Sequence, residues 1–164
     1  MTAVYVYPIY GFGGRIWSWP VEDYIAVHLR NIKDVHVAKT RSYGQWREIV
    51  EEIKGQPAGS KTVVIGHSMG AGAATYVTDY VKVDLVVCYD AAGQSCSYVG
   101  PNTCKLLDFW DRVFALVPKV RPRALPKHAH KIERIETLFG HTQQPTAPNL
   151  LHRVANEVRA LAAS

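Results

Sequence analysis

Apolar and polar residues are arranged along this chain in two patterns, one typical of buried strands and one typical of amphipathic helices. Continuous apolar runs, such as those at 63–65 and 85–88, predict strands that are buried on both faces. Strands are expected over the ranges 3–11, 34–39, 62–66, 84–90, 105–111 and 130–138. Apolar residues at helical spacing predict helices over 19–32, 43–54, 68–81 and 148–162.

Strands that alternate with helices favour a mainly parallel sheet covered on both faces, which is a three-layer α/β fold. We expect about six strands in this sheet. The whole chain, residues 1–164, is expected to form a single domain, because its length is ordinary for one. Ligands of open parallel sheets bind beyond the carboxyl ends of the strands, so the chemistry is sought in the residues that follow each strand.

A serine lies between two glycines in TVVIGHSMGAGAAT (62–75), at the point where a predicted strand passes into a predicted helix. Residues 66–70, Gly-His-Ser-Met-Gly, fit the pattern G-x-S-x-G in the structural context that gives this pattern its meaning. The turn strains the backbone of its central residue, and flanking glycines let the strand and helix pass closely. Ser68 would then project its hydroxyl above the sheet at a helix N-terminus, which favours developing negative charge. The pattern predicts Ser68 as a nucleophile.

A nucleophilic serine needs a base, and the base needs an acid that orients it. Asp90 ends the strand that follows the Ser68 helix, and His141 follows the last predicted strand. The order Ser, Asp, His is the one expected for this type of turn. His67 adjoins the serine but should point away from its hydroxyl, so we expect it to play a supporting role.

On these residues the chain resembles the α/β-hydrolase superfamily over nearly its whole length. The stretch YDAAG (89–93) is similar to the Asp-Pro-Ala-Gly stretch of lipases, and the resemblance favours Asp90 as the acid. The commoner position of the acid in the superfamily is one strand later, which would nominate Asp111 or, less well, Asp108. The resemblance further implies a trimmed α/β-hydrolase fold without a large cap, in which 113–127 is the only candidate lid.

Acyl transfer also needs hydrogen-bond donors for the oxyanion that forms at the substrate. One is expected to be the backbone N–H of Met69, the residue after the nucleophile. Residues 10–13, Tyr-Gly-Phe-Gly, occupy the place where similar hydrolases carry His-Gly followed by the second donor, which makes Phe12 the expected donor and Gly13 the alternative. The same loop does not complete the G-x-G-x-x-G pattern of dinucleotide-binding proteins.

The composition, with 48% hydrophobic and 20% charged residues, is that of an ordinary globular protein. No apolar run approaches the ~20 residues of a membrane span. No secretory signal is recognised at the N-terminus, so a cytoplasmic location is the default expectation. Three cysteines are too few and too scattered for a disulfide framework or a zinc site, and no metal or other cofactor is expected. Cys96 and Cys104 could pair, although free thiols are the first expectation.

The net charge of +5 could suggest an acidic partner, and much of it lies between Lys105 and Arg134. Nucleic-acid binding is not expected, because neither interleaved aromatic residues nor a known motif accompanies the charge. This stretch is interpreted as a solvated basic face.

Together these features predict a serine hydrolase that cleaves a small-molecule or lipid-like acyl ester or thioester through an acyl-enzyme. An ester is favoured over a peptide, because nothing suggests a peptide-binding edge or cap. The alternative is a non-catalytic relative, a binding or scaffold protein that uses the basic face. Every expected catalytic position is filled, which weighs against this alternative.

Overall fold

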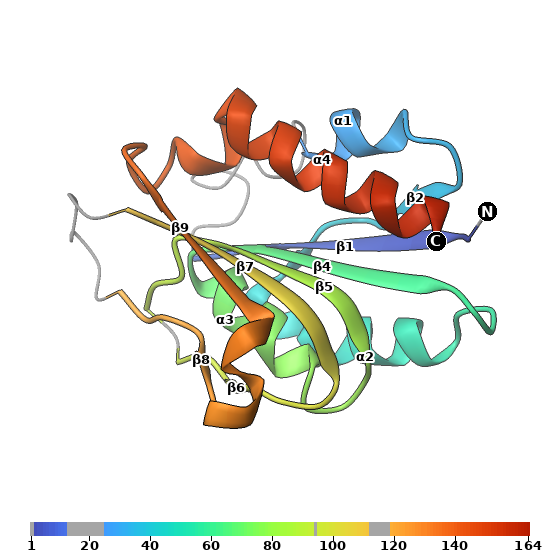
Figure 1. Cartoon of the computed structure of the whole chain (residues 1–164), viewed down its shortest axis with the longest axis horizontal. Coiled ribbons are helices and arrows are strands. Elements are labelled where there is room, and N and C mark those ends of the chain that lie inside the picture. Colours follow the sequence, from blue (N-terminus) through green and yellow to red (C-terminus); the bar gives the residue numbers. More distant parts are fainter. Residues whose placement is uncertain (1, 13–24, 94, 112–118) are drawn as a thin grey trace.

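A seven-stranded sheet forms the middle layer of the molecule (Figure 1). The structure is a computed structural model that describes residues 2–12, 25–93, 95–111 and 119–164. The strands run in the spatial order β2 (Val35–Val37), β1 (Val4–Tyr10), β4 (Lys61–His67), β5 (Val83–Tyr89), β7 (Thr103–Asp111) and β9 (Ile132–Thr137), and β3 (Arg41–Ser42) pairs with the end of β1. All of these pairings are parallel, so the sheet is the parallel one that the sequence predicts.

Helices cover both faces of this sheet. In Figure 1, α1 (Ala26–Arg30) and α4 (Pro148–Ala163) lie above it, whereas α2 (Trp46–Lys54) and α3 (Met69–Val77) lie below it. The prediction of a three-layer α/β fold is therefore confirmed.

The core is divided by the sheet into two apolar clusters, because successive strand residues point to opposite faces. On β4, Val63 and Ile65 pack toward α1 and α4, and Val64 between them packs toward α2 and α3. The same alternation on β7 places Leu107 on the first side and Leu106 on the second. The face on which a side chain near a strand end lies can thus be read from its position in the strand.

Several element boundaries differ from the sequence prediction. The observed α1 covers only part of the helix expected at 19–32, and residues 13–24 lie outside the described residues. Helix α3 ends at Val77, before the expected 81, where Thr75 and Thr78 turn their hydroxyls back onto backbone carbonyls at 2.7 Å. Such hydroxyls compete with the backbone for hydrogen bonds and do not favour helix interiors.

Short elements that the sequence did not predict surround the last strands. The 3-10 helix η4 (Pro126–Lys131) takes the first two residues of the strand expected at 130–138. A separate two-stranded sheet joins β6 (Tyr98–Val99) to β8 (Arg123–Ala124). The 3-10 helix η5 (Gln144–Thr146) precedes α4. These elements are too short to carry a hydrophobic period, so their absence from the prediction is expected. The helix predicted at 43–54 is divided into the 3-10 helix η3 (Tyr43–Gln45) and α2.

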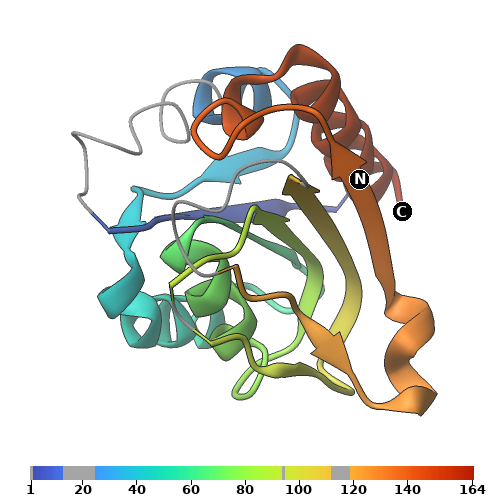
Figure 2. The ribbon, with the colours of Figure 1, turned by 90° about the vertical axis from the view of Figure 1, so that its left-hand side faces the viewer.

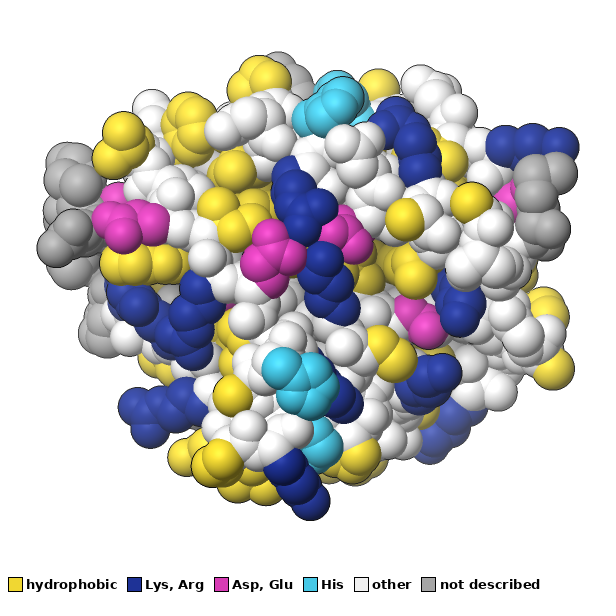
Figure 3. Space-filling model, in the orientation of Figure 1, with side chains coloured by type: hydrophobic (Ala, Val, Ile, Leu, Met, Phe, Trp, Pro, Cys, Tyr) yellow, Lys and Arg dark blue, Asp and Glu magenta, His cyan; other side chains and the backbone are white. Residues whose placement is uncertain are grey.

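The positive charge between Lys105 and Arg134 does not form one uniform basic face. In Figure 3, Lys and Arg side chains alternate with acidic ones in the middle of the surface that carries β9 and α4. There Lys105 lies 2.6 Å from Glu157 and 3.1 Å from Glu133. Arg153 pairs with the same two carboxylates at 2.6 and 2.8 Å. Lys105 and Arg153 on this surface are therefore both paired with carboxylates.

The remaining expectations from composition concern cysteines and membrane spans. Cys88, Cys96 and Cys104 are all free thiols, and Cys88 is buried. Among the described residues, no helix has both the length and the apolar character that crossing a membrane requires.

The closest backbone contact at the end of β4 yields a test of the fold. A Cβ atom added at Gly66 would lie 2.1 Å from the carbonyl oxygen of Gly70, so Gly66→Ala forces the strand and the helix apart. We expect the free energy of unfolding in urea to fall by about 3 kcal/mol or more. Gly44→Ala is the matched control, because a Cβ there would meet nothing closer than 4.0 Å. Its unfolding free energy should change by less than about 1 kcal/mol, and equal effects of the two variants would contradict this packing.

Candidate active site

Ser68 lies in the sharp turn between β4 and α3. Its backbone has φ 57° and ψ −123°, a left-handed conformation that costs energy for any residue with a Cβ. The Ser68 N–H donates to the carbonyl of Tyr89 on β5 at 3.0 Å, so the turn is fixed to the neighbouring strand. The strained turn that the G-x-S-x-G pattern predicts is present.

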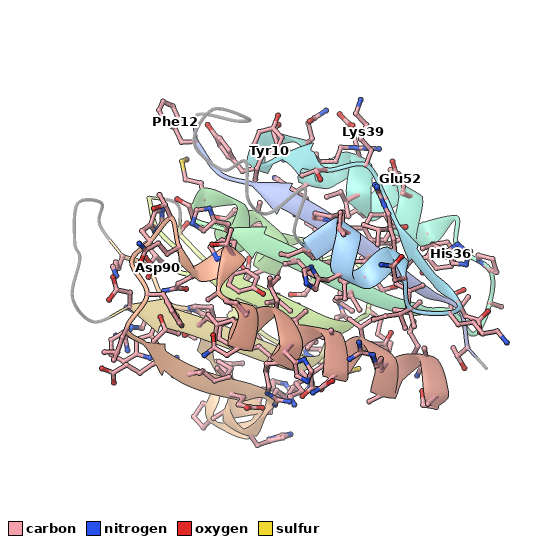
Figure 4. The ribbon with its side chains drawn as sticks, turned by 90° about the horizontal axis from the view of Figure 1, so that it is seen from above. Tyr10, Phe12, His36, Lys39, Glu52 and Asp90 are labelled. Carbon is pink, nitrogen blue, oxygen red and sulfur yellow. The ribbon has the colours of Figure 1, made fainter. Side chains whose placement is uncertain are left out.

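The loop after β1 approaches this turn closely. A Cβ added at Gly11 would lie 2.9 Å from the Cβ of Ser68 and 3.0 Å from the backbone nitrogen of Met69. Phe12, the next residue, is 76% exposed and lies with Asp90 at the same end of the sheet, whereas His36 lies at the other end (Figure 4). The two expected oxyanion donors, the N–H groups of Phe12 and Met69, therefore belong to segments that touch. Gly13 lies outside the described residues.

Asp90 and His141 meet at this edge of the sheet, which Figure 2 views end-on. The Nδ1 atom of His141 lies 2.6 Å from Oδ2 of Asp90, in hydrogen-bond contact. Asp90 is 1% exposed and, like Ser68, has a positive φ, here 42°. Burial alone raises the pKa of Asp90, but hydrogen bonds from His141 and Lys119 outweigh burial, so its pKa lies below the ordinary value. The carboxylate is thus held in its charged, accepting form.

Ser68 and His141 are at the same edge without touching through their polar atoms. No hydrogen bond joins the hydroxyl of Ser68 to the ring of His141, although both residues are described. The ring nitrogen opposite the Asp90 contact, Nε2, is the one chemically suited to face a serine.

The two other acids that the sequence brought forward have different surroundings. Asp111 donates its backbone N–H to Oδ1 of Asp90 at 3.3 Å, and its carboxylate lies 3.5 Å from the ammonium group of Lys119. Asp108 points to the face of the sheet that carries α2 and α3, since it alternates with Leu107. Burial raises the pKa of Asp108 to about 6, and its Oδ2 has no hydrogen-bond partner among the described residues.

The side chain of His67 contacts both the backbone and the ring of His141. Its Nε2 lies 2.7 Å from the backbone carbonyl oxygen of His141, and the centroids of the two rings are 4.6 Å apart. Burial and then the nearby charge of His141 lower the pKa of His67 to about 4, so its ring is neutral at neutral pH. A neutral ring bound to a carbonyl must carry its proton on Nε2. His67 therefore donates to the loop that carries His141.

Lys119 is the residue of this edge that sequence reasoning missed. Its ammonium group lies 3.2 Å from Oδ1 of Asp90 and donates to the carbonyl of Asp111 at 2.6 Å. It belongs to the candidate lid at 113–127, of which residues 113–118 lie outside the described residues. Lysines in irregular segments between prolines carry no period or motif, so no sequence signal marked this one.

A cavity of about 430 Å³ lies at the opposite end of the sheet, where β4 and β5 begin. Its charged lining includes Lys61 and Lys82, which lie 3.5 and 4.0 Å from the carboxylate of Asp84. These charges balance one another in part, and ligands of parallel sheets bind at the other end. The edge with Ser68 remains the better candidate site.

Among the described residues, no group of three or more His, Cys, Asp or Glu side chains could hold a metal ion.

The parallel sheet, its flanking helices and the strained turn after β4 define an α/β-hydrolase type of fold. The crystal structure of acyl-protein thioesterase 2 from Zea mays is similar, with a TM-score of 0.61 over 98% of this chain and 94% of that chain. The two sequences are 15% identical, so the likeness concerns the fold. No protein-family model matches the sequence, and no curated protein matches it either.

The burial of His67 predicts a specific dependence of stability on pH. The unfolded chain takes up a proton at His67 near the ordinary histidine pKa, whereas the folded protein does so only near its pKa of about 4. The stability from a neutral His67 is therefore fully present above about pH 7 and is lost as the pH falls. The difference in unfolding free energy between wild type and His67→Gln should shrink by about 2 kcal/mol from pH 7 to pH 5.

This comparison separates His67 from Asp108, which responds in the opposite direction. The pKa of Asp108 is raised to about 6, so its protonation favours the folded state as the pH falls through the same window. Both proteins of the comparison contain Asp108, and its contribution cancels in their difference. Parallel stability curves for wild type and His67→Gln would show that His67 is not held neutral.

Proposed function

We propose that this protein is a serine hydrolase that cleaves a carboxylic ester or thioester through an acyl-enzyme. The observation that carries the proposal is the contact of 2.6 Å between Asp90 and His141, beside a serine in a strained strand-to-helix turn. A carboxylate that accepts from Nδ1 fixes the tautomer in which Nε2 can act as a base. The likeness of the fold to an acyl-protein thioesterase supports the class of reaction.

In this proposal the Ser68 hydroxyl attacks the carbonyl carbon of the substrate while His141 takes the hydroxyl proton on Nε2. The new bond is the one between the serine oxygen and the acyl carbon. The N–H groups of Met69 and Phe12 stabilise the oxyanion, since the segments that carry them touch at Gly11. The alcohol or thiol then leaves with the proton from His141. In the second half of the reaction, water attacks the acyl carbon while His141 takes its proton, and the bond between the acyl carbon and the serine oxygen breaks. The acid is released, and Ser68 recovers its proton from His141.

The surroundings of the site favour an apolar acyl group. Phe12 and Leu138 follow the ends of β1 and β9, and they are 76% and 89% exposed. Large apolar side chains that remain exposed beside a polar site offer contact area to an apolar ligand. We therefore propose a small-molecule or lipid-like acyl substrate.

Replacement of the nucleophile tests the reaction class. Ser68→Ala should lower kcat by several powers of ten on a panel of p-nitrophenyl esters and acyl-CoA thioesters. It should also abolish labelling by a fluorophosphonate probe, which modifies activated serines. Ser60→Ala, at the opposite end of the sheet, is the matched control and should keep both properties.

Two outcomes would contradict the assignment. A folded Ser68→Ala protein with more than about a tenth of the wild-type activity would exclude Ser68 as the nucleophile. A folded wild type that neither hydrolyses any ester of the panel nor reacts with the probe would favour a non-catalytic binding or scaffold protein.

The identity of the acid is tested by two isosteric variants. Asp90→Asn should lower kcat by roughly 10³–10⁴, because the amide can no longer hold the right tautomer of His141 or stabilise its charged form. Asp111→Asn should lower kcat by less than about tenfold, because the Asp111 carboxylate lies against Lys119. The reverse ranking of the two kcat values would move the acid to Asp111.

A further inference from the structure

The two faces of β9 differ in how their charges are paired. Glu133 lies on the face toward α4, where Lys105 and Arg153 approach its carboxylate to 3.1 and 2.8 Å. Arg134, the next residue, points to the face that carries α2 and α3, because successive strand residues alternate. Its guanidinium forms no ion pair with a carboxylate of the described residues. One face of β9 is therefore paired, and the other carries a cation without such a partner.

A cavity of about 350 Å³ lies beside Arg134. It is bounded by β6, β8, η4 and the start of β9, and Figure 1 shows β6 and β8 below the sheet, the side that carries α2 and α3. This volume lies within the range of small-molecule sites. The six residues that line the cavity are all described: Tyr98, Arg123, Ala124, Ala129, Ile132 and Arg134.

Backbone pairing and one hydrogen bond bring the polar groups of this cavity together. Tyr98 on β6 lies opposite Arg123 on β8 in the parallel register. Nη2 of Arg134 donates to the carbonyl of Pro122 at 2.6 Å, and Pro122 directly precedes Arg123 in the chain. Arg123 is exposed and has no hydrogen bond or ion pair with another described residue. Because each guanidinium has five N–H donors, most donors of the pair remain available to a ligand.

No acidic residue lines this cavity. Asp108 lies opposite Arg134 in the register of β7 and β9, but it is buried and does not belong to the lining. Glu136, two residues further along β9, does not line the cavity either. In Figure 3, the lower left of the surface, where Figure 1 places β6 and β8, shows mainly Lys and Arg among its charged side chains. The lining of the cavity therefore carries positive charge only.

The cavity at the start of β4 and β5 is a weaker candidate for an anion. There the carboxylate of Asp84 lies 3.5 Å from Lys61 and 4.0 Å from Lys82, within the lining itself. An anion in that cavity would meet a carboxylate of its own sign. An anion beside Arg134 would meet two guanidinium groups, the hydroxyl of Tyr98 and apolar side chains.

We propose that the cavity binds the phosphate monoester of a small molecule through Arg123 and Arg134. Two guanidinium groups match the double negative charge of a phosphate monoester, and their planar forks can each bind two of its oxygens. The ring of Tyr98 is 56% exposed and, with Ile132, offers apolar contact to the organic group of the ester. None of the lining residues belongs to the proposed active site, so the inference does not rest on the hydrolase.

The experiment is a titration of the protein with phenyl phosphate at pH 8, followed by the backbone amide signals in NMR spectra. At this pH phenyl phosphate carries two negative charges, because the second pKa of a phosphate monoester is about 6. The signals of Tyr98, Arg123 and Ala129 should shift with a common Kd below about 1 mM. Arg123→Gln and Arg134→Gln should each raise this Kd about tenfold or more, because each removes a charged hydrogen-bond donor.

Three controls separate this site from a general attraction of anions. Benzenesulfonate has a similar shape but one negative charge, so its Kd should be about tenfold higher. A phosphodiester of a nucleic acid also carries one charge per phosphate, so the same comparison distinguishes the two kinds of phosphate. Inorganic phosphate lacks the ring and should also bind more weakly. Arg159→Gln removes a positive charge from α4, on the other face of the sheet, and should leave the Kd within about twofold of wild type.

Three results would overturn the proposal: no saturable shift up to about 10 mM phenyl phosphate, equal Kd values for phenyl phosphate and benzenesulfonate, or the same loss of affinity in Arg159→Gln as in Arg123→Gln. Equal binding of inorganic phosphate would overturn the role of the Tyr98 ring. If Arg134→Gln does not fold, Arg123→Gln decides alone, since the Arg123 side chain has no partner among the described residues that the variant would lose. The titration needs no turnover, so its result is independent of whether Ser68 is a nucleophile.

Discussion

The approach of backbone to backbone at the end of β4 is the constraint on which the rest of the site depends. Added Cβ atoms would lie 2.1 Å from the Gly70 carbonyl at Gly66, and 2.3 Å from the Ile9 carbonyl at Gly70. No other residue type leaves room for α3 to start this close to β4 and to the end of β1. Because these three elements are locked together, the loop after β1 is brought against Ser68. The pair of backbone donors proposed for the oxyanion follows from this packing.

Hydrogen bonds between neighbouring strands hold two residues at the edge of the sheet in strained backbone conformations. Ser68 and Asp90 both follow the last residue of a strand and both have positive φ angles, 57° and 42°. The N–H of Ser68 donates to Tyr89 on β5 at 3.0 Å, and that of Asp90 donates to Phe109 on β7 at 2.8 Å. Each strained residue thus keeps one bond to the next strand. Strained conformations persist where the surroundings determine them in this way, and here they aim two side chains above the same edge.

The parts of the structure that follow from local pattern were predictable, and the parts that follow from packing were not. Apolar runs placed the main strands to within a few residues, and strand ends indicated the edge where Asp90 and His141 meet. Their catalytic roles stay a proposal. The segment with Lys119 has no period, and it is held beside Asp90 by the bridge of Lys119 to Ala92 and the hydrogen bond of Val120 to Ala91, which only the folded chain creates. The contact of His67 with the His141 carbonyl likewise joins residues that lie 74 positions apart.

His141 comes from the loop after the edge strand β9, yet the residues that hold it come from the centre of the sheet. Asp90 on the β5 side binds its ring at 2.6 Å, and His67 at the end of β4 binds its backbone carbonyl at 2.7 Å. One contact fixes the ring and the other fixes the chain that carries it, so the orientation of the imidazole is set twice. A base that is already oriented needs little rearrangement when charge develops on it. Residues at the ends of the central strands therefore position the groups of the proposed chemistry, and the loop after β9 contributes the side chain of His141.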